Sequence, residues 1–237
     1  MISHPPQHLL NRVRAIVVVA TVLFAAALVP LSARAQFLHP KVSKKETTIR
    51  NIVILPAKVN VVRDGMKGPE GMAAESEELS ARVEKMLAEV LANKKKVNTL
   101  GSMAASGEAE TQTKYAVADI QTKFDDLLPT VMKKRSDVKK GRFTMGDEVL
   151  NLNLDKTADA IVFIRGEGKK LTGGKKAFNL LVGGMPAYLR LQIGVIDARN
   201  GEVLLYTDPI FAGDPTTAVD RLRKALESGF KKLPAVS

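Results

Sequence analysis

The chain has 237 residues, with 36 lysine and arginine residues against 25 aspartate and glutamate residues, and a formal net charge of +11. It contains no cysteine and no tryptophan. The absence of cysteine excludes disulfide bonds, a thiol nucleophile and a lipid-modified lipoprotein. Burial of an apolar core must therefore stabilise the fold alone.

Residues 1–35 have the features of a secretory signal peptide. A basic start precedes a mainly apolar run at residues 15–28, and the small residues Ala33 and Ala35 stand where signal peptidase requires them. The sequence therefore predicts cleavage before Gln36 and an exported protein, either periplasmic or secreted. The apolar run is shorter than the roughly 20 residues of a full span, which disfavours the alternative of an uncleaved membrane anchor.

The exported part is predicted to comprise a flexible tail at residues 36–50 and one α/β domain at residues 51–234. The tail is expected because its residues are mostly polar. The domain begins with a β-rich run at residues 52–62, which Pro56 interrupts and a glycine-rich loop follows.

Two amphipathic helices are predicted next, separated by a short strand at residues 97–101 and a polar loop at residues 102–113. The second helix begins near Lys114, and Pro129 kinks or ends it. One or two helical turns follow at residues 146–158. The first helix has apolar residues at helical spacing, and these are Leu79, Val83, Met86, Leu87, Val90 and Leu91.

The last part of the chain alternates between strands and a closing helix. Strands are predicted at residues 158–168 and 186–198, and Asn200-Gly201 indicates a tight hairpin because both residue types tolerate the left-handed conformation. Asp214 is expected to cap the closing helix. The element order predicts an α/β (α+β) fold, in which amphipathic helices flank a mixed sheet with a C-terminal antiparallel hairpin.

Few side chains suited to catalysis remain after signal removal. His39 is the one histidine left, it falls in the predicted tail, and a zinc site lacks nitrogen and sulfur ligands. The sequence therefore predicts a protein that is not an enzyme and has no metal or cofactor. Neighbouring carboxylates keep a carboxylate-dependent hydrolase open as an alternative, and these are Asp125, Asp126, Asp147, Glu148, Asp155 and Asp159.

The stretch "RGEGKKLTGGKKAF" at residues 165–178 resembles a phosphate-binding loop only superficially. The P-loop pattern fails because Gly174 stands where lysine is required, and the dinucleotide pattern fails because Leu171 replaces its third glycine. We predict instead a long, mobile loop at residues 166–186 that joins two strands. Its candidate contacts with a partner or an anion are Lys169, Lys170, Lys175, Lys176 and Phe178.

An apolar patch follows these lysines at Phe178, Leu180, Leu181 and Val182. Such a patch either packs back on the sheet or meets a partner. We expect core packing, because large apolar patches are seldom left exposed.

The stretches "IVILPAK", "ADAIVFIRGEG" and "GVIDARNGEVLLY" carry a resemblance to a known group of domains. In this order they resemble the α/β domain of bacterial envelope proteins related to the curli-secretion lipoprotein CsgG, the penicillin-binding-protein activator lipoproteins and the amino-terminal domain of TolB. The resemblance implies a mixed sheet flanked by helices, and a role in envelope assembly through protein contacts. The residues of its D-x-x-x-G-E-V-L hairpin are Asp197, Gly201, Glu202, Val203 and Leu204.

Two function classes follow from these observations, besides the hydrolase. The first is a non-enzymatic exported envelope protein that binds an envelope protein as an assembly or accessory module. The second is a binder of anionic envelope polymer or lipid through the lysines of the predicted loop. Neither involves nucleic acid or a stable membrane span after signal removal.

Overall fold

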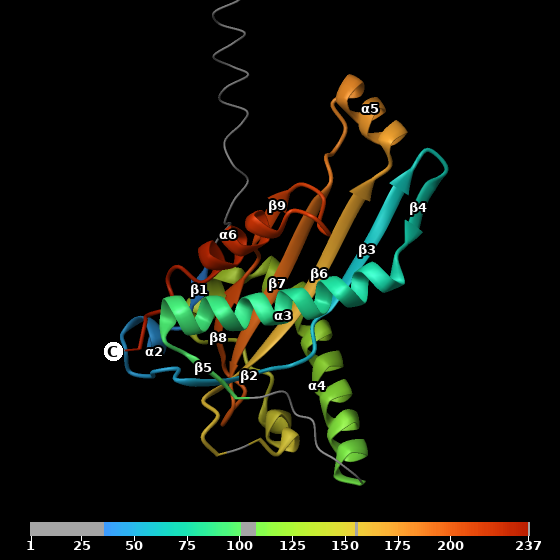
Figure 1. The fold of residues 1–237 in the computed structure, drawn as a ribbon. Coiled ribbons are helices and arrows are strands. Elements are labelled where there is room, and N and C mark those ends of the chain that lie inside the picture. Colours follow the sequence, from blue (N-terminus) through green and yellow to red (C-terminus); the bar gives the residue numbers. More distant parts are fainter. Residues whose placement is uncertain (1–35, 101–107, 155, 237) are drawn as a thin grey trace, which may run out of the picture. The chain divides into compact units, whose positions relative to one another are not determined.

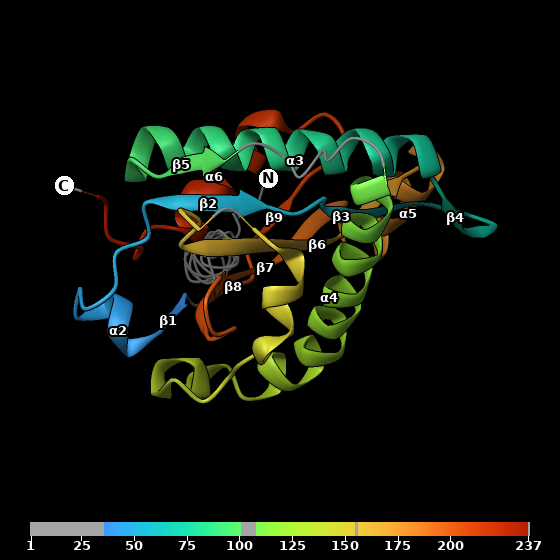
Figure 2. The same ribbon diagram turned by 90° about the horizontal axis from the view of Figure 1, so that it is seen from below.

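One mixed β-sheet organises the residues that the computed structural model describes, 36–100, 108–154 and 156–236 (Figure 1). Helices cover both faces of this sheet, which confirms the predicted α/β class (Figure 2). The strands are β1 (Phe37–Leu38), β2 (Asn51–Ile54), β3 (Lys58–Gly65), β4 (Gly68–Gly71), β5 (Asn98–Leu100), β6 (Ala160–Leu171), β7 (Tyr188–Asp197), β8 (Val203–Thr207) and β9 (Ile210–Ala212). The helices are α2 (Pro40–Ser43), α3 (Ala73–Lys95), α4 (Glu108–Lys133), α5 (Gly173–Val182) and α6 (Val219–Gly229), with 3-10 helices η1 (Arg135–Lys140) and η2 (Asp147–Leu152).

Strand β6 lies at the centre of the sheet. Both β2 and β3 pair with it in parallel, β2 at residues 160–162 and β3 at residues 165–171, while β7 pairs with it antiparallel. The break between β2 and β3 contains Pro56, which has no N–H to donate, so the predicted first strand becomes two. The glycine-rich stretch predicted as a loop instead contains β4, which pairs antiparallel with β3 as a hairpin.

Each face of the sheet has its own apolar core. Successive residues of β6 alternate between them: Val162 and Ile164 pack with α3 and α6, whereas Ile161 and Phe163 pack with α4. All four side chains are fully buried. The predicted apolar face of α3 is confirmed, since its buried residues are Leu79, Val83, Met86, Leu87, Val90 and Leu91.

Helix α4 approaches the second face closely because residue 194 has no side chain. The rings of Phe124 and Phe163 stack with centroids 4.7 Å apart, and a Cβ on Gly194 would lie 2.6 Å from the ring of Phe124. The prediction that Pro129 kinks or ends this helix is corrected in part, because Pro129 lies inside it and the helix continues to Lys133.

Residues 36–42 are packed on the sheet, which corrects the prediction of a flexible tail over the whole of residues 36–50. Strand β1 pairs antiparallel with β8, and the side chains of His39 and Val42 are buried. The physical reason lies at the sheet edge: without β1, strand β8 would present unpaired N–H and C=O groups there. The polar composition of the segment gave no indication of this pairing.

Residues 166–186 are not a loop. The first six continue β6 to Leu171, and the next ones form α5 before β7 begins. The strand continues because its partners β3 and β7 extend alongside it, so every residue from 165 to 169 pairs on both sides. The glycines that suggested a loop are accommodated in the strand, where Gly166 gives room to Val59 and Leu191.

Asp214 does not cap the closing helix. Its side chain accepts a hydrogen bond from the backbone N–H of Thr216, and α6 begins at Val219. Asp214 therefore closes a separate turn that precedes the helix.

Candidate docking surface at the α5 tip

Helix α5 stands at the far end of β6 and β7, beyond the helices that cover the rest of the sheet (Figure 1). The Thr172 hydroxyl caps its N-terminus by accepting from the N–H of Lys175, and Gly183 ends it with a φ of 69°. A threonine cap and a glycine terminator are common helix boundaries, so these two residues were a signal for α5 in the sequence.

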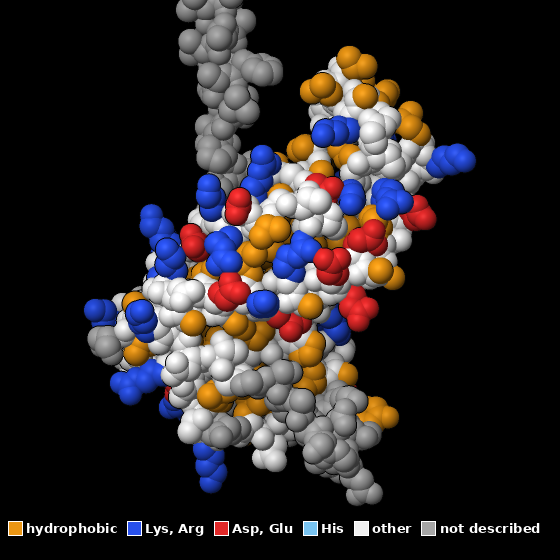
Figure 3. All heavy atoms as spheres, in the orientation of Figure 1, with side chains coloured by type: hydrophobic (Ala, Val, Ile, Leu, Met, Phe, Trp, Pro, Cys, Tyr) orange, Lys and Arg blue, Asp and Glu red, His pale blue; other side chains and the backbone are white. Residues whose placement is uncertain are grey.

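The apolar side chains of α5 face solvent, which corrects the expectation that they pack on the core. Leu180 is 86% exposed and Leu181 is 85% exposed, and Figure 3 shows hydrophobic side chains gathered at this end of the molecule. They stay exposed because α5 rests on the strand ends, where no second layer of the described chain faces it. We call this surface the α5 tip, and its side chains are Met66, Phe178, Leu180, Leu181, Val182 and Met185.

The four lysines predicted as one mobile basic group fall into two pairs. Lys169 and Lys170 belong to β6 and make ion pairs, at 2.6 Å with Asp64 and at 3.7 Å with Asp214. The hydrogen bond from Lys169 lowers the pKa of Asp64. Burial alone would raise the pKa of Asp214, but its hydrogen bonds from Thr216 and its interaction with Lys170 together outweigh burial, so the net shift is downward.

Lys175 and Lys176 belong to α5 and have no ion-pair partner among the described residues. The Lys175 ammonium group lies 5.9 Å from the ring centroid of Phe178, within range of a cation–π contact. These two lysines therefore keep their charge available beside the α5 tip, whereas the charges of Lys169 and Lys170 are balanced within the fold.

A cavity of about 740 Å³ lies under α5, between this helix and the connection from β9 to α6. Its walls are mainly apolar, with Leu171, Ala177, Leu180 and Ala187 among them. The α5 helix thus has two sides, an outer side with Leu181 and an inner side above this cavity.

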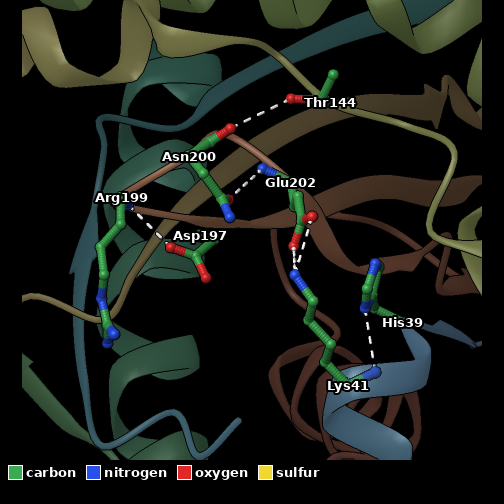
Figure 4. A network of polar contacts seen from close by, with 7 residues as sticks. All are labelled: His39, Lys41, Thr144, Asp197, Arg199, Asn200 and Glu202. Atoms are coloured by element: carbon green, nitrogen blue, oxygen red, sulfur yellow. Dashed lines mark hydrogen bonds and ion pairs between the residues drawn. The ribbon is translucent and has the colours of Figure 1, made fainter.

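The opposite end of the molecule has a different character, which Figure 4 shows in detail. The ammonium group of Lys41 donates to both carboxylate oxygens of Glu202, at 3.0 and 2.7 Å, and so ties α2 to the β7–β8 hairpin. This bond lowers the pKa of Glu202. Burial lowers the pKa of His39, whose Nδ1 accepts from the N–H of Lys41.

The hairpin motif that carries the family resemblance has structural roles in this network. The Asp197 carboxylate accepts from the N–H of Arg199, and Glu202 binds Lys41. The predicted hairpin is confirmed, but only Gly201 adopts a left-handed conformation, with a φ of 70°, while Asn200 uses its side chain to accept from the N–H of Glu202.

The predicted cleavage site is described only at Gln36. Ala33 and Ala35 lie outside the described residues. The Gln36 side chain is buried, donates to the carbonyl of Ser228 and accepts from the N–H of Lys232. The first residue of the predicted exported chain is thus held against the end of α6.

Three of the six carboxylates considered for a hydrolase have separate ion-pair partners. Asp125 pairs with Arg165, Glu148 with Lys123, and Asp159 with Arg199. Asp155 lies outside the described residues. Within the described part of the chain, no cluster of three or more histidine, cysteine, aspartate or glutamate side chains could hold a metal ion.

Comparison with protein-family models found no match, and comparison with curated protein sequences found none either. The solved structures similar to this chain include two of the PelC dodecamer from Paraburkholderia phytofirmans. One has 11% identity and a TM-score of 0.40, covering 87% of this chain and 99% of that chain. The other, a substituted form, has 9% identity and a TM-score of 0.37, covering 80% and 90%. At these scores the likeness carries no argument about function or assembly.

The described helices were also compared with the length and hydropathy that a bilayer span requires. In the part of the chain that the structure describes, none of them meets both requirements.

Proposed function

We propose that the protein is a non-enzymatic exported protein of the cell envelope that acts by binding, as an assembly or accessory module, and that the α5 tip is its docking surface. The observation that carries this proposal is the exposure of Leu180 and Leu181 on a capped helix. Contiguous exposed apolar side chains on a folded protein commonly mark an interaction site.

Three further features support the proposal. The signal-like residues 1–35 support export, and the resemblance to envelope domains supports a role in the envelope. The separate ion pairs of Asp125, Glu148 and Asp159 favour binding over catalysis, because a hydrolase needs carboxylates that converge on one bond.

The second candidate function is binding of anionic envelope polymer or lipid. The charges of Lys175 and Lys176 beside the α5 tip favour this candidate, because these two lysines have no ion-pair partner among the described residues. The two lysines of β6, Lys169 and Lys170, are already paired. This candidate predicts binding that weakens as salt rises, because solvent-exposed charges are screened.

A photo-crosslinking amino acid placed at position 181 tests the leading proposal in the intact envelope. The matched control carries the same group at Leu150, which is 54% exposed on η2. We expect a discrete crosslinked species from position 181 and none from position 150. Equal crosslinking at both positions, or at neither, would contradict the assignment of the α5 tip as the docking surface.

A further inference from the structure

The geometry points to a second binding site beside the docking surface: the cavity under α5 binds an amphiphile with one acyl chain and an anionic head group. The site shares Leu180 with the α5 tip and Lys176 with the second candidate function, and it narrows that candidate to one class of ligand. Its volume of about 740 Å³ is typical of ligand cavities, which span about 300–1,000 Å³. Such cavities are mostly apolar and contain a few polar groups that orient the ligand.

The apolar part of the cavity suits a hydrocarbon chain. Leu171 contributes from the end of β6, Ala177 from α5, and Pro186 and Ala187 from the connection to β7, while the exposed Leu180 borders the opening of the cavity. Asn179 also lines the cavity, but its side-chain amide already donates to the carbonyl of Met185 at 2.8 Å. The walls therefore provide apolar contacts for the hydrocarbon chain of a ligand. The Asn179 amide does not need a hydrogen bond from that ligand, because it already has a partner.

The charged residues of the cavity favour an anionic head group. Lys176 and Arg221 both line it, and Lys176 has no ion-pair partner among the described residues. One guanidinium nitrogen of Arg221 donates to the carbonyl of Ala212, which leaves its other N–H groups for a ligand. The acidic lining residue, Asp214, is balanced by Lys170 at 3.7 Å. The net local charge is thus positive.

Helix α5 forms one wall of the cavity and has glycines at both ends. It begins with Gly173-Gly174 and is followed by Gly183-Gly184, and all four glycines are exposed. Because α5 forms one wall of the cavity, a bound chain would contact its inner side and leave the outer side, with Leu181, unchanged.

Displacement of a fluorescent fatty acid from the exported protein tests the inference. The competitors are oleate, which has a chain and an anionic head; oleyl alcohol, which has the chain alone; and acetate, which has the head alone. We expect oleate to displace the probe, oleyl alcohol to be about tenfold weaker because the charge-assisted contacts are lost, and acetate to have no effect.

Variants locate the bound ligand. Lys176→Ser and Arg221→Ser should each weaken oleate about tenfold and leave oleyl alcohol unchanged, whereas Lys224→Ser, an exposed lysine of α6 outside the cavity, should change neither. Ala187→Phe should block both ligands by filling the cavity. Ala177→Phe does the same from the opposite wall, so a folding defect in one variant leaves the other as a test.

Leu181→Ser separates the cavity from the docking surface, because Leu181 does not line the cavity. It should leave oleate binding unchanged. Weaker binding in Leu181→Ser together with normal binding in Ala177→Phe and Ala187→Phe would overturn the cavity site while leaving the docking surface intact. Failure of oleate to displace the probe would also overturn it. Crosslinking at position 181 tests the docking surface alone.

Discussion

The two ends of the sheet use the same kinds of residue in opposite ways. At the end with β1 and α2, charged side chains are paired, as in Lys41–Glu202, and apolar side chains such as Val42 are buried. At the α5 tip, leucines are exposed and lysines are left without ion-pair partners. The first arrangement stabilises the fold, whereas the second adds little to stability and keeps apolar and cationic groups available to another molecule.

The sharpest test of this contrast compares one substitution at the two ends. Leu205→Ala removes a fully buried side chain from β8 and should lower the free energy of unfolding by about 2–5 kcal/mol. Leu181→Ala should change it by less than about 0.5 kcal/mol, because the side chain is already in water. Urea unfolding of both variants measures the difference. Similar losses in the two variants would mean that the α5 tip is part of the core.

A second test compares lysines a few residues apart. Lys169→Ser leaves Asp64, whose side chain is only 13% exposed, without its ion-pair partner, and should lower the midpoint of thermal unfolding. Lys175→Ser should leave that midpoint unchanged, because Lys175 has no ion pair to lose among the described residues. Equal effects would contradict the division of the four lysines into structural and available pairs.

A smaller effect is expected from pH at the amino-terminal end. Burial holds the pKa of His39 below its ordinary value of 6.5, so the unfolded chain binds a proton more readily than the folded one as pH falls through that value. The contribution of neutral His39 to the free energy of unfolding should therefore be fully present above about pH 6.5 and decrease below it. The charge of Lys41 also lowers the pKa of His39, whereas the carboxylates of Glu202, Asp197 and Glu46 oppose this lowering.

Hydrogen exchange of β1 and α2, measured at several pH values around 6.5, reports the local loss of stability that is expected near His39. The quantity to compare is the protection factor, the exchange rate relative to that of the unfolded chain at the same pH. His39→Gln should flatten the pH dependence of this factor in β1 and α2, while the protection factor of α5 should be insensitive to pH in both proteins. A pH dependence that persists in His39→Gln would show that another group is responsible.

Regular periodicity made most of the fold predictable. The apolar spacing of Leu79 to Leu91 identified α3, and the continuous apolar run before Arg165 identified β6, because burial on both faces requires such patterns. The short strands β1 and β9 could not be predicted, since two or three residues carry no period and their pairing partners are distant in sequence.

The candidate site was predicted less well, for a related reason. Lysines and glycines in residues 166–186 suggested a loop, although Thr172 and Gly183 are common helix boundaries. Whether Leu180 and Leu181 are buried depends on what faces α5, and that is a property of the assembled sheet rather than of the local sequence. Met66 and Met185 were missed because each is isolated in the sequence and joins the α5 tip only in the fold.

The central claim is that the outer side of α5 becomes covered when the protein acts. The chain has no cysteine, so a Leu181→Cys variant can carry a single attached dye whose emission reports the polarity around that surface. Its emission should shift to the blue when the labelled protein is returned to its own envelope fraction, and the emission of a labelled Leu150→Cys control should not shift. Emission from the labelled Leu181→Cys protein that remains typical of water under those conditions would contradict the assignment of α5 as a docking surface.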